Sequence, residues 1–93
     1  MNAKAKGTRN EHRAMRLLGQ MGYRCTRSSA SLGEWDVIAI GPRDVVLVQV
    51  KTNRTAPPAE REAMLRFPAP PCCRKELWIF KDGKRQPIIR SMD

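Results

Sequence analysis

Histidine and cysteine are scarce in this chain of 93 residues, and each shortage removes a class of site. His12 is the only histidine, and the 3 cysteines include an adjacent pair, Cys72 and Cys73, that cannot form the C-x-x-C spacing of zinc sites. A His–Cys zinc cluster or a Ser-His-Asp triad would have to depend on that one imidazole. We therefore expect Cys25 and the adjacent pair to be reduced, small apolar side chains.

Long hydrophobic runs and aromatic residues are also rare. No apolar segment approaches the ~20 residues that span a bilayer, and the N-terminus lacks the apolar stretch of a signal peptide. These absences predict a cytoplasmic protein, of a prokaryotic cell or a phage-infected host, with no membrane partner. Aromatic residues make up 5% of the chain, and several are needed for a core, so few remain to stack on RNA bases.

Acidic residues are outnumbered, with 9 Asp and Glu against 18 Lys and Arg, which leaves a net charge of +9. This excess favours a polyanionic partner, and nucleic acid is a stronger candidate than an anionic membrane surface. A chain of this length forms one small domain that buries a modest share of its surface. We therefore expect a partner subunit or a ligand to add stability.

The hydrophobic pattern predicts a single α/β (α+β) domain, residues 1–93, in the order α-β-β-β-α-β-β, with a mixed central sheet flanked by helices. Residues 1–7 are expected to be a flexible basic tail. Helical spacing of apolar residues predicts a first helix from Thr8 to Met21. The other expected elements are strands at 23–29, 34–40 and 45–51, a helix from the Pro57-Pro58 pair to about Phe67, and strands at 76–81 and 85–90. Asp82-Gly83 is expected to form a two-residue hairpin turn, and Pro87 places the last strand at a sheet edge.

The segment Gly41–Asp44 reads as a turn between two apolar strands. If it closes a hairpin, Asp36 in the first strand lies opposite Gln49 in the second, and Lys51 lies one diagonal step away on the same face. Burying a carboxylate and an ammonium in apolar surroundings is unfavourable unless something compensates their charges. A metal ion and a phosphate would do so.

The residue types at this point suit phosphodiester hydrolysis. The Asp36 carboxylate, the Gln49 side-chain oxygen and the Val50 carbonyl are oxygen donors of the kind that Mg²⁺ takes. Lys51 would hold the attacking water or stabilise charge on the phosphate. A structural alternative stays open, in which Asp36 and Lys51 form a partly buried salt bridge.

Glu11 is a further candidate, with two interpretations. It lies on the border of the apolar face of the first helix and can point toward whatever that helix packs on. However, Thr8-x-x-Glu11 is also a capping box, which would use the carboxylate at the helix start.

These segments together resemble the PD-(D/E)xK nucleases, and within them the archaeal-type Holliday junction resolvases. The resemblance covers about half of the chain, and it implies a restriction-endonuclease-like core. It is carried by Lys6–Glu11 at the first helix, Arg27-Ser28 and Ser31 before the strand, Trp35–Ala39 around the aspartate, and Val48–Lys51.

The resemblance also implies roles for individual residues. The implied catalytic residues are Glu11, Asp36, Gln49 and Lys51. The implied metal site is formed by Asp36, Gln49, Val50 and Glu11. Contacts to DNA are implied for Lys6, Arg9, Arg13, Arg27, Ser28 and Ser31. The implied cofactor is Mg²⁺, with Mn²⁺ as a substitute and no small-molecule cofactor. The implied protein is a homodimer that cuts branched or double-stranded DNA in recombination and repair, because symmetric junction cleavage requires two sites related by a two-fold axis.

One position departs from the family pattern. Gln49 stands where members usually carry glutamate, which removes one negative charge and is expected to weaken metal binding or to leave one ion in place of two. Two alternatives to a junction resolvase therefore stay open. One is a non-catalytic nucleic-acid-binding module with a decayed site, and the other is a nicking, repair or restriction-type nuclease of the same fold.

Overall fold

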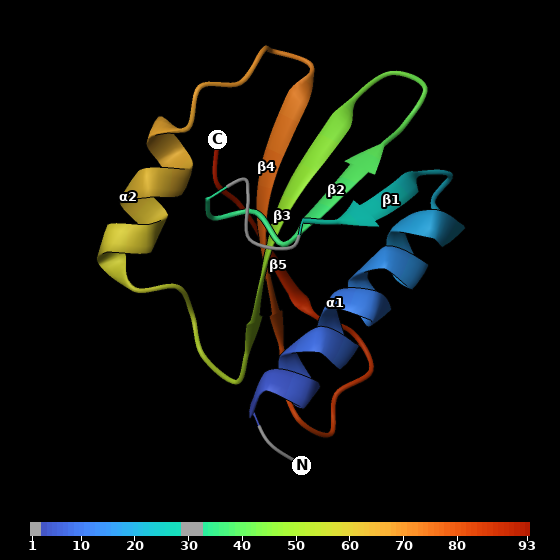
Figure 1. Ribbon diagram of the computed structural model, residues 1–93, viewed down its shortest axis with the longest axis vertical. Helices are drawn as coiled ribbons and strands as arrows, with labels where there is room; N and C mark the ends of the chain where they lie inside the picture. The colour runs from blue at the N-terminus through green and yellow to red at the C-terminus, as the bar shows by residue number, and fades with distance from the viewer. Residues whose placement is uncertain (1–2, 29–32) are drawn as a thin grey trace.

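The computed structural model describes residues 3–28 and 33–93 (Figure 1). Its elements follow the predicted order of helices and strands. They are α1 (Ala3–Gln20), β1 (Arg24–Arg27), β2 (Val37–Ile40), β3 (Val45–Thr52), α2 (Pro58–Arg66), β4 (Cys73–Phe80) and β5 (Ile88–Ser91).

The five strands form one mixed sheet in the order β1-β2-β3-β4-β5. Strands β3 and β4 are parallel, and α2 lies in the connection between them, because parallel neighbours need a long crossover. The other neighbouring pairs are antiparallel. The predicted α+β class with a mixed central sheet is confirmed, and β5 is an edge strand, as Pro87 indicated.

Each helix covers one face of the sheet, and each face has its own apolar core (Figure 1). Ala14 and Leu18 of α1 pack on the inward side chains of β2 and β3, together with Trp78 and Phe80. Met64 of α2 packs on the opposite face. The second core contains Trp35, Leu47, Ala56, Met64, Leu77, Ile79 and Met92.

The hairpin of β2 and β3 has the predicted register, with Val37 opposite Val48 and Ile40 opposite Val45. Its turn is closed by the Gly41 N–H, which donates to the Asp44 carbonyl at 2.8 Å. A Cβ at Gly41 would lie 2.7 Å from the Tyr23 ring, so the close approach of that ring requires glycine at this position.

The start of α1 differs from the prediction, because the helix begins at Ala3 and not at Thr8. The expected tail is therefore wrong for residues 3–7, where the Ala3–Lys6 segment contains only alanine and lysine, both strong helix formers. Lys6 also forms an ion pair with Asp82 at 2.8 Å. Thr8 and Glu11 lie inside the helix, so the capping-box interpretation is wrong.

The last two strands also differ from their expected bounds. Strand β4 begins at Cys73, because it pairs with β3 along its whole length from Val45 onward. The β4–β5 ladder ends at the pair Ile79 and Ile88, so Asp82-Gly83 is not a two-residue hairpin turn. Asp82 is held instead by Asn53, which accepts its backbone N–H and donates to its carboxylate, both at 2.9 Å.

Membrane insertion through a helix is not supported by the described part of the chain. Neither α1 nor α2 combines the length and the apolar character that a bilayer span requires.

Candidate functional site

The predicted site lies where β3 continues past the start of β2. Asp36 directly precedes β2, and its backbone N–H donates to the Val48 carbonyl at 2.8 Å. Its carboxylate Oδ2 accepts the Val50 N–H, also at 2.8 Å. These two contacts lie on either side of Gln49, but the β2–β3 ladder ends at the pair Val37 and Val48, so it does not include a direct pairing of Asp36 with Gln49. Because the N–H and C=O of a strand residue point to the same side, the Val50 carbonyl also points toward the Asp36 side.

The Gln49 side chain is almost fully buried, with 7% of the residue exposed. Its Nε2 donates to Glu60 Oε1 at 3.3 Å. Its Oε1 is buried and has no hydrogen-bond partner among the described residues. A buried acceptor without a partner is unfavourable by about 1–3 kcal/mol, so this oxygen has a strong preference for a cation or donor.

Lys51 is also buried, with 9% of the residue exposed, and its Nζ lies 2.7 Å from Glu60 Oε1. The salt bridge expected in the structural alternative, Asp36 with Lys51, is not among the ion pairs of residues 3–28 and 33–93. The Asp36 carboxylate accepts the Val50 N–H, and the ammonium pairs with α2. Lys51 therefore has a partner that the hairpin alone did not predict.

Glu60 is the functional candidate that the sequence reasoning missed. It lies in the first turn of α2, which starts with Pro58 at a position where proline is favoured. A carboxylate there interacts favourably with the positive end of the helix dipole. The only sequence signal is an acidic residue near the start of a helix that follows the Lys51 strand, and this pattern is common on solvent-exposed helices.

The charges around Asp36 are predominantly negative. Burial raises the pKa of Asp36 above its ordinary value, and the Val50 N–H opposes this by stabilising the carboxylate. Glu11 and Glu60 raise the pKa of Asp36 further, while Lys51 lowers it. A carboxylate in this environment is stabilised by taking up a proton or a cation.

Glu11 faces the same site from α1. A pocket of about 530 Å³ is lined by Glu11, Asp36, Gln49, Val50 and Lys51 among others. Arg27 of β1 holds the Glu11 carboxylate, with both Nε and Nη2 lying 3.0 Å from Oε1. The four predicted catalytic residues thus line one pocket, and Arg27 contacts one of them.

The other residues predicted to contact DNA lie in different surroundings. Ser28 donates its backbone N–H to the Asp36 carbonyl at 2.9 Å, and its buried Oγ has no hydrogen-bond partner among the described residues. Lys6 lines the pocket, and Arg9 is exposed on α1. Ser31 lies outside the described residues.

The Arg13 side chain is held by contacts within the protein. Its Nη2 donates to the carbonyls of Lys84 and Arg85 at 3.2 and 3.1 Å, and its guanidinium lies 4.7 Å from the centre of the Phe80 ring. The guanidinium therefore ties the segment before β5 to α1. This leaves less of Arg13 for the predicted contact with DNA.

The donor set is compatible with a magnesium ion. In the described part of the chain, no group of three or more His, Cys, Asp and Glu side chains is arranged to hold a metal. The predicted set is of another kind, because it combines the Asp36 carboxylate with the Gln49 amide oxygen and the Val50 carbonyl. Mg²⁺ is bound by few protein oxygens and keeps several waters. The unpartnered Gln49 Oε1 is the observation that fits such an ion.

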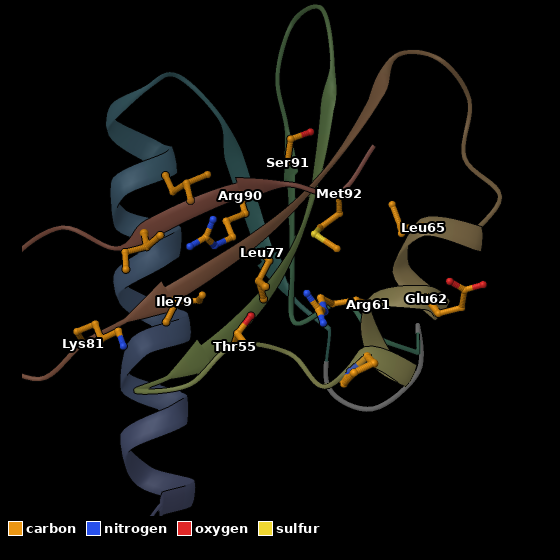
Figure 2. Close-up of a pocket in the computed structure, with 13 residues that line it drawn as sticks. Thr55, Arg61, Glu62, Leu65, Leu77, Ile79, Lys81, Arg90, Ser91 and Met92 are labelled. Carbon is orange, nitrogen blue, oxygen red and sulfur yellow. The ribbon is translucent and has the colours of Figure 1, made fainter.

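A larger groove, of about 1050 Å³, lies elsewhere, between α2, β4 and β5 (Figure 2). In this view Met92 lies between Leu77 of β4 and Leu65 of α2. None of the predicted catalytic residues lines this groove. The groove is a candidate surface for contact with a second subunit, because Leu65, Ile88 and Ile89 are large apolar residues that remain exposed there. Residues 77–80 of β4 do not offer a comparable surface, since these side chains are buried in the two cores.

Comparison with known proteins identifies the fold. No protein-family model matches the chain, and no curated protein matches its sequence. A solved structure of Archaeoglobus fulgidus Hjc, a Holliday junction resolvase from an archaeal hyperthermophile, is similar with a TM-score of 0.77 and 19% identity. The similarity covers 94% of this chain and 73% of that one. The chain therefore has the fold of this resolvase, in agreement with the resemblance of residues 7–51.

Proposed function

We propose that this protein is a metal-dependent, structure-selective DNA endonuclease whose preferred substrate is the four-way junction. The observation that carries the proposal is the convergence of Asp36, Gln49 and Lys51 at one end of β3, in a pocket that Glu11 also lines. The fold shared with an archaeal Holliday junction resolvase supports the same activity. The D…Q-x-K pattern of the sequence supports a nuclease site at the same position.

The residues of the pocket divide the chemistry among them. Asp36, Gln49 Oε1 and the Val50 carbonyl would hold Mg²⁺, with Mn²⁺ as a substitute and Glu11 nearby. Such an ion lowers the pKa of a bound water and neutralises charge on a phosphate. The Lys51 ammonium donates to the attacking water or to a phosphate oxygen, where its burial strengthens the interaction.

Binding of DNA follows from the charge of the chain. A net charge of +9 favours contact with the phosphate backbone, and such binding weakens steeply with salt. Lys6 at the pocket and Arg9 on the exposed face of α1 would contact phosphates. Arg27 acts through Glu11, which it orients toward the pocket.

A homodimer is part of the proposal, because paired cuts in a four-way junction require two sites related by a two-fold axis. We place the subunit contact at the groove between α2 and β5. Leu65, Ile88 and Ile89 are 48%, 41% and 46% exposed there, which is a concentration of apolar surface that a second subunit would cover.

The test is cleavage of labelled four-way junction, flap and duplex DNA by wild type and by Asp36→Asn, with Mg²⁺, Mn²⁺ or EDTA. We expect paired cuts in the junction by wild type with either metal, and none in EDTA or with the variant. Both proteins should still bind the junction in EDTA. No product from any substrate, with protein in excess, would reject the enzyme in favour of a non-catalytic binding module. Cleavage of flap or duplex alone would indicate a repair or restriction-type nuclease.

A further inference from the structure

We infer that Glu60 of α2 is the second acidic ligand of this site and supplies the negative charge that Gln49 cannot. The inference rests on the proposed metal-dependent activity. Glu60 lies in the first turn of α2, next to the end of β3. Its Oε1 is 2.7 Å from Lys51 Nζ and 3.3 Å from Gln49 Nε2. It therefore contacts both residues of the Gln-x-Lys pair. None of the sequence patterns at this site includes it.

The amide at position 49 and the carboxylate at position 60 are matched to one another. The donor end of the Gln49 amide contacts Glu60, and its acceptor end, Oε1, is buried and has no hydrogen-bond partner in the described part of the chain. A glutamate at position 49 would instead place two carboxylates in contact, which is unfavourable unless a cation or proton lies between them. The presence of Glu60 thus explains why an amide is tolerated, and favoured, at the usual acidic position.

The electrostatic influence of Glu60 extends to the other metal candidate. Glu60 is close enough to Asp36 to raise the pKa of its carboxyl group, as Glu11 does from α1. The carboxylates of Glu11, Asp36 and Glu60 are therefore near the end of β3 together with the Lys51 ammonium, although no three acidic side chains of the described residues are already arranged to hold a metal. A site of this charge is suited to a divalent cation.

The competing explanation is that Glu60 only positions Lys51 through their ion pair. The two roles predict effects of different size on metal affinity, because a carboxylate that does not bind the metal acts on it only through its charge at a distance. Glu62 provides a matched control. It lies in the same helix, is 55% exposed and pairs with Arg66 at 2.8 Å.

The experiment measures Mn²⁺ binding to the protein without DNA, by titration calorimetry, for wild type, Glu60→Gln, Gln49→Glu, the double variant and Glu62→Gln. We expect Glu60→Gln to weaken binding at least about tenfold, and the double variant to recover most of that loss because the carboxylate has moved to position 49. Glu62→Gln should bind as wild type does. Circular dichroism of each variant checks the fold, and the double variant keeps the test valid if Glu60→Gln is poorly folded.

Three results would overturn the assignment. Unchanged Mn²⁺ affinity in Glu60→Gln would show that Glu60 is not a metal ligand. Slower junction cleavage in the same variant would then indicate that it positions Lys51, and unchanged cleavage that it has neither role. Failure of the double variant to recover affinity would show that the carboxylate at position 60 has no metal-ligating role that position 49 can replace. Wild type that neither binds Mn²⁺ nor cleaves would reject the proposed function itself, and the Glu60 assignment with it.

Discussion

Replacement of Lys51 by methionine separates a catalytic lysine from a structural one. Methionine keeps most of the buried aliphatic chain and removes the ammonium, which is paired with Glu60 at 2.7 Å. The Glu60 side chain is 37% exposed, so water can solvate its carboxylate after the partner is lost. The loss of stability should therefore be about 1 kcal/mol, as for exposed pairs, and not the ~3–5 kcal/mol of a broken buried pair. For a domain of this size that corresponds to a fall in Tm of about 4–8 °C.

The effect on cleavage should be much larger. Loss of a buried donor that stabilises charge in the transition state lowers the rate roughly 10²–10³-fold. Junction binding in EDTA should be largely kept. Urea unfolding, single-turnover cleavage and gel shift on the same preparations measure the three quantities, with the exposed Lys84→Met as the control. A variant that loses ~3 kcal/mol or more while it cleaves nearly as fast as wild type would show that Lys51 is a structural ion-pair residue.

Two further predictions concern Asp36 and the dimer. Because burial and neighbouring carboxylates raise the pKa of Asp36, the folded protein binds a proton there more tightly than the unfolded chain does, and stability falls as pH rises through that pKa. In EDTA, Asp36→Asn should therefore be more stable than wild type near neutral pH, with the gap closing as pH falls toward about 4; urea unfolding that shows no such convergence would contradict the shift. Ile89→Lys should convert a dimer to a monomer in sedimentation velocity, whereas Ile40→Lys, at an equally exposed position outside the groove, should not. A wild-type monomer at micromolar concentration would reject both the dimer and paired junction cleavage.

The hairpin that carries Asp36, Gln49 and Lys51 could be predicted because its determinants are local. A short turn and strict alternation of side chains define its register, and a one-residue slip would expose the whole apolar face. The start of α1 could not be predicted as well. Residues 3–6 have high helix propensity but no apolar face of their own, Gly7 has low propensity, and the contact of Lys6 with Asp82 comes from the other end of the chain.

The partner of Lys51 could not be predicted from the hairpin for a related reason. Strand spacing places Lys51 near Asp36, but the Asp36 carboxylate already accepts the Val50 N–H, a contact that exists because β3 extends past β2. Glu60 reaches the ammonium because α2 lies in the connection from β3 to its parallel neighbour β4, and the first turn of α2 lies against the end of β3. That path depends on a pairing between strands far apart in sequence, so no spacing rule around Lys51 contains it.

The same geometry changes what the glutamine at position 49 means for activity. If only the charges along the strand are considered, an amide in place of a carboxylate should weaken metal binding or indicate a decayed site. A cation, however, responds to the oxygens and the total charge around it, whichever element supplies them. Glu60 contacts the amide, and Gln49 Oε1 has no partner among residues 3–28 and 33–93, so the negative charge is moved from β3 to α2 and is not removed. Gln49 is thus compatible with a working nuclease as long as Glu60 is present. The effect of substitution at position 49 must depend on the residue at position 60.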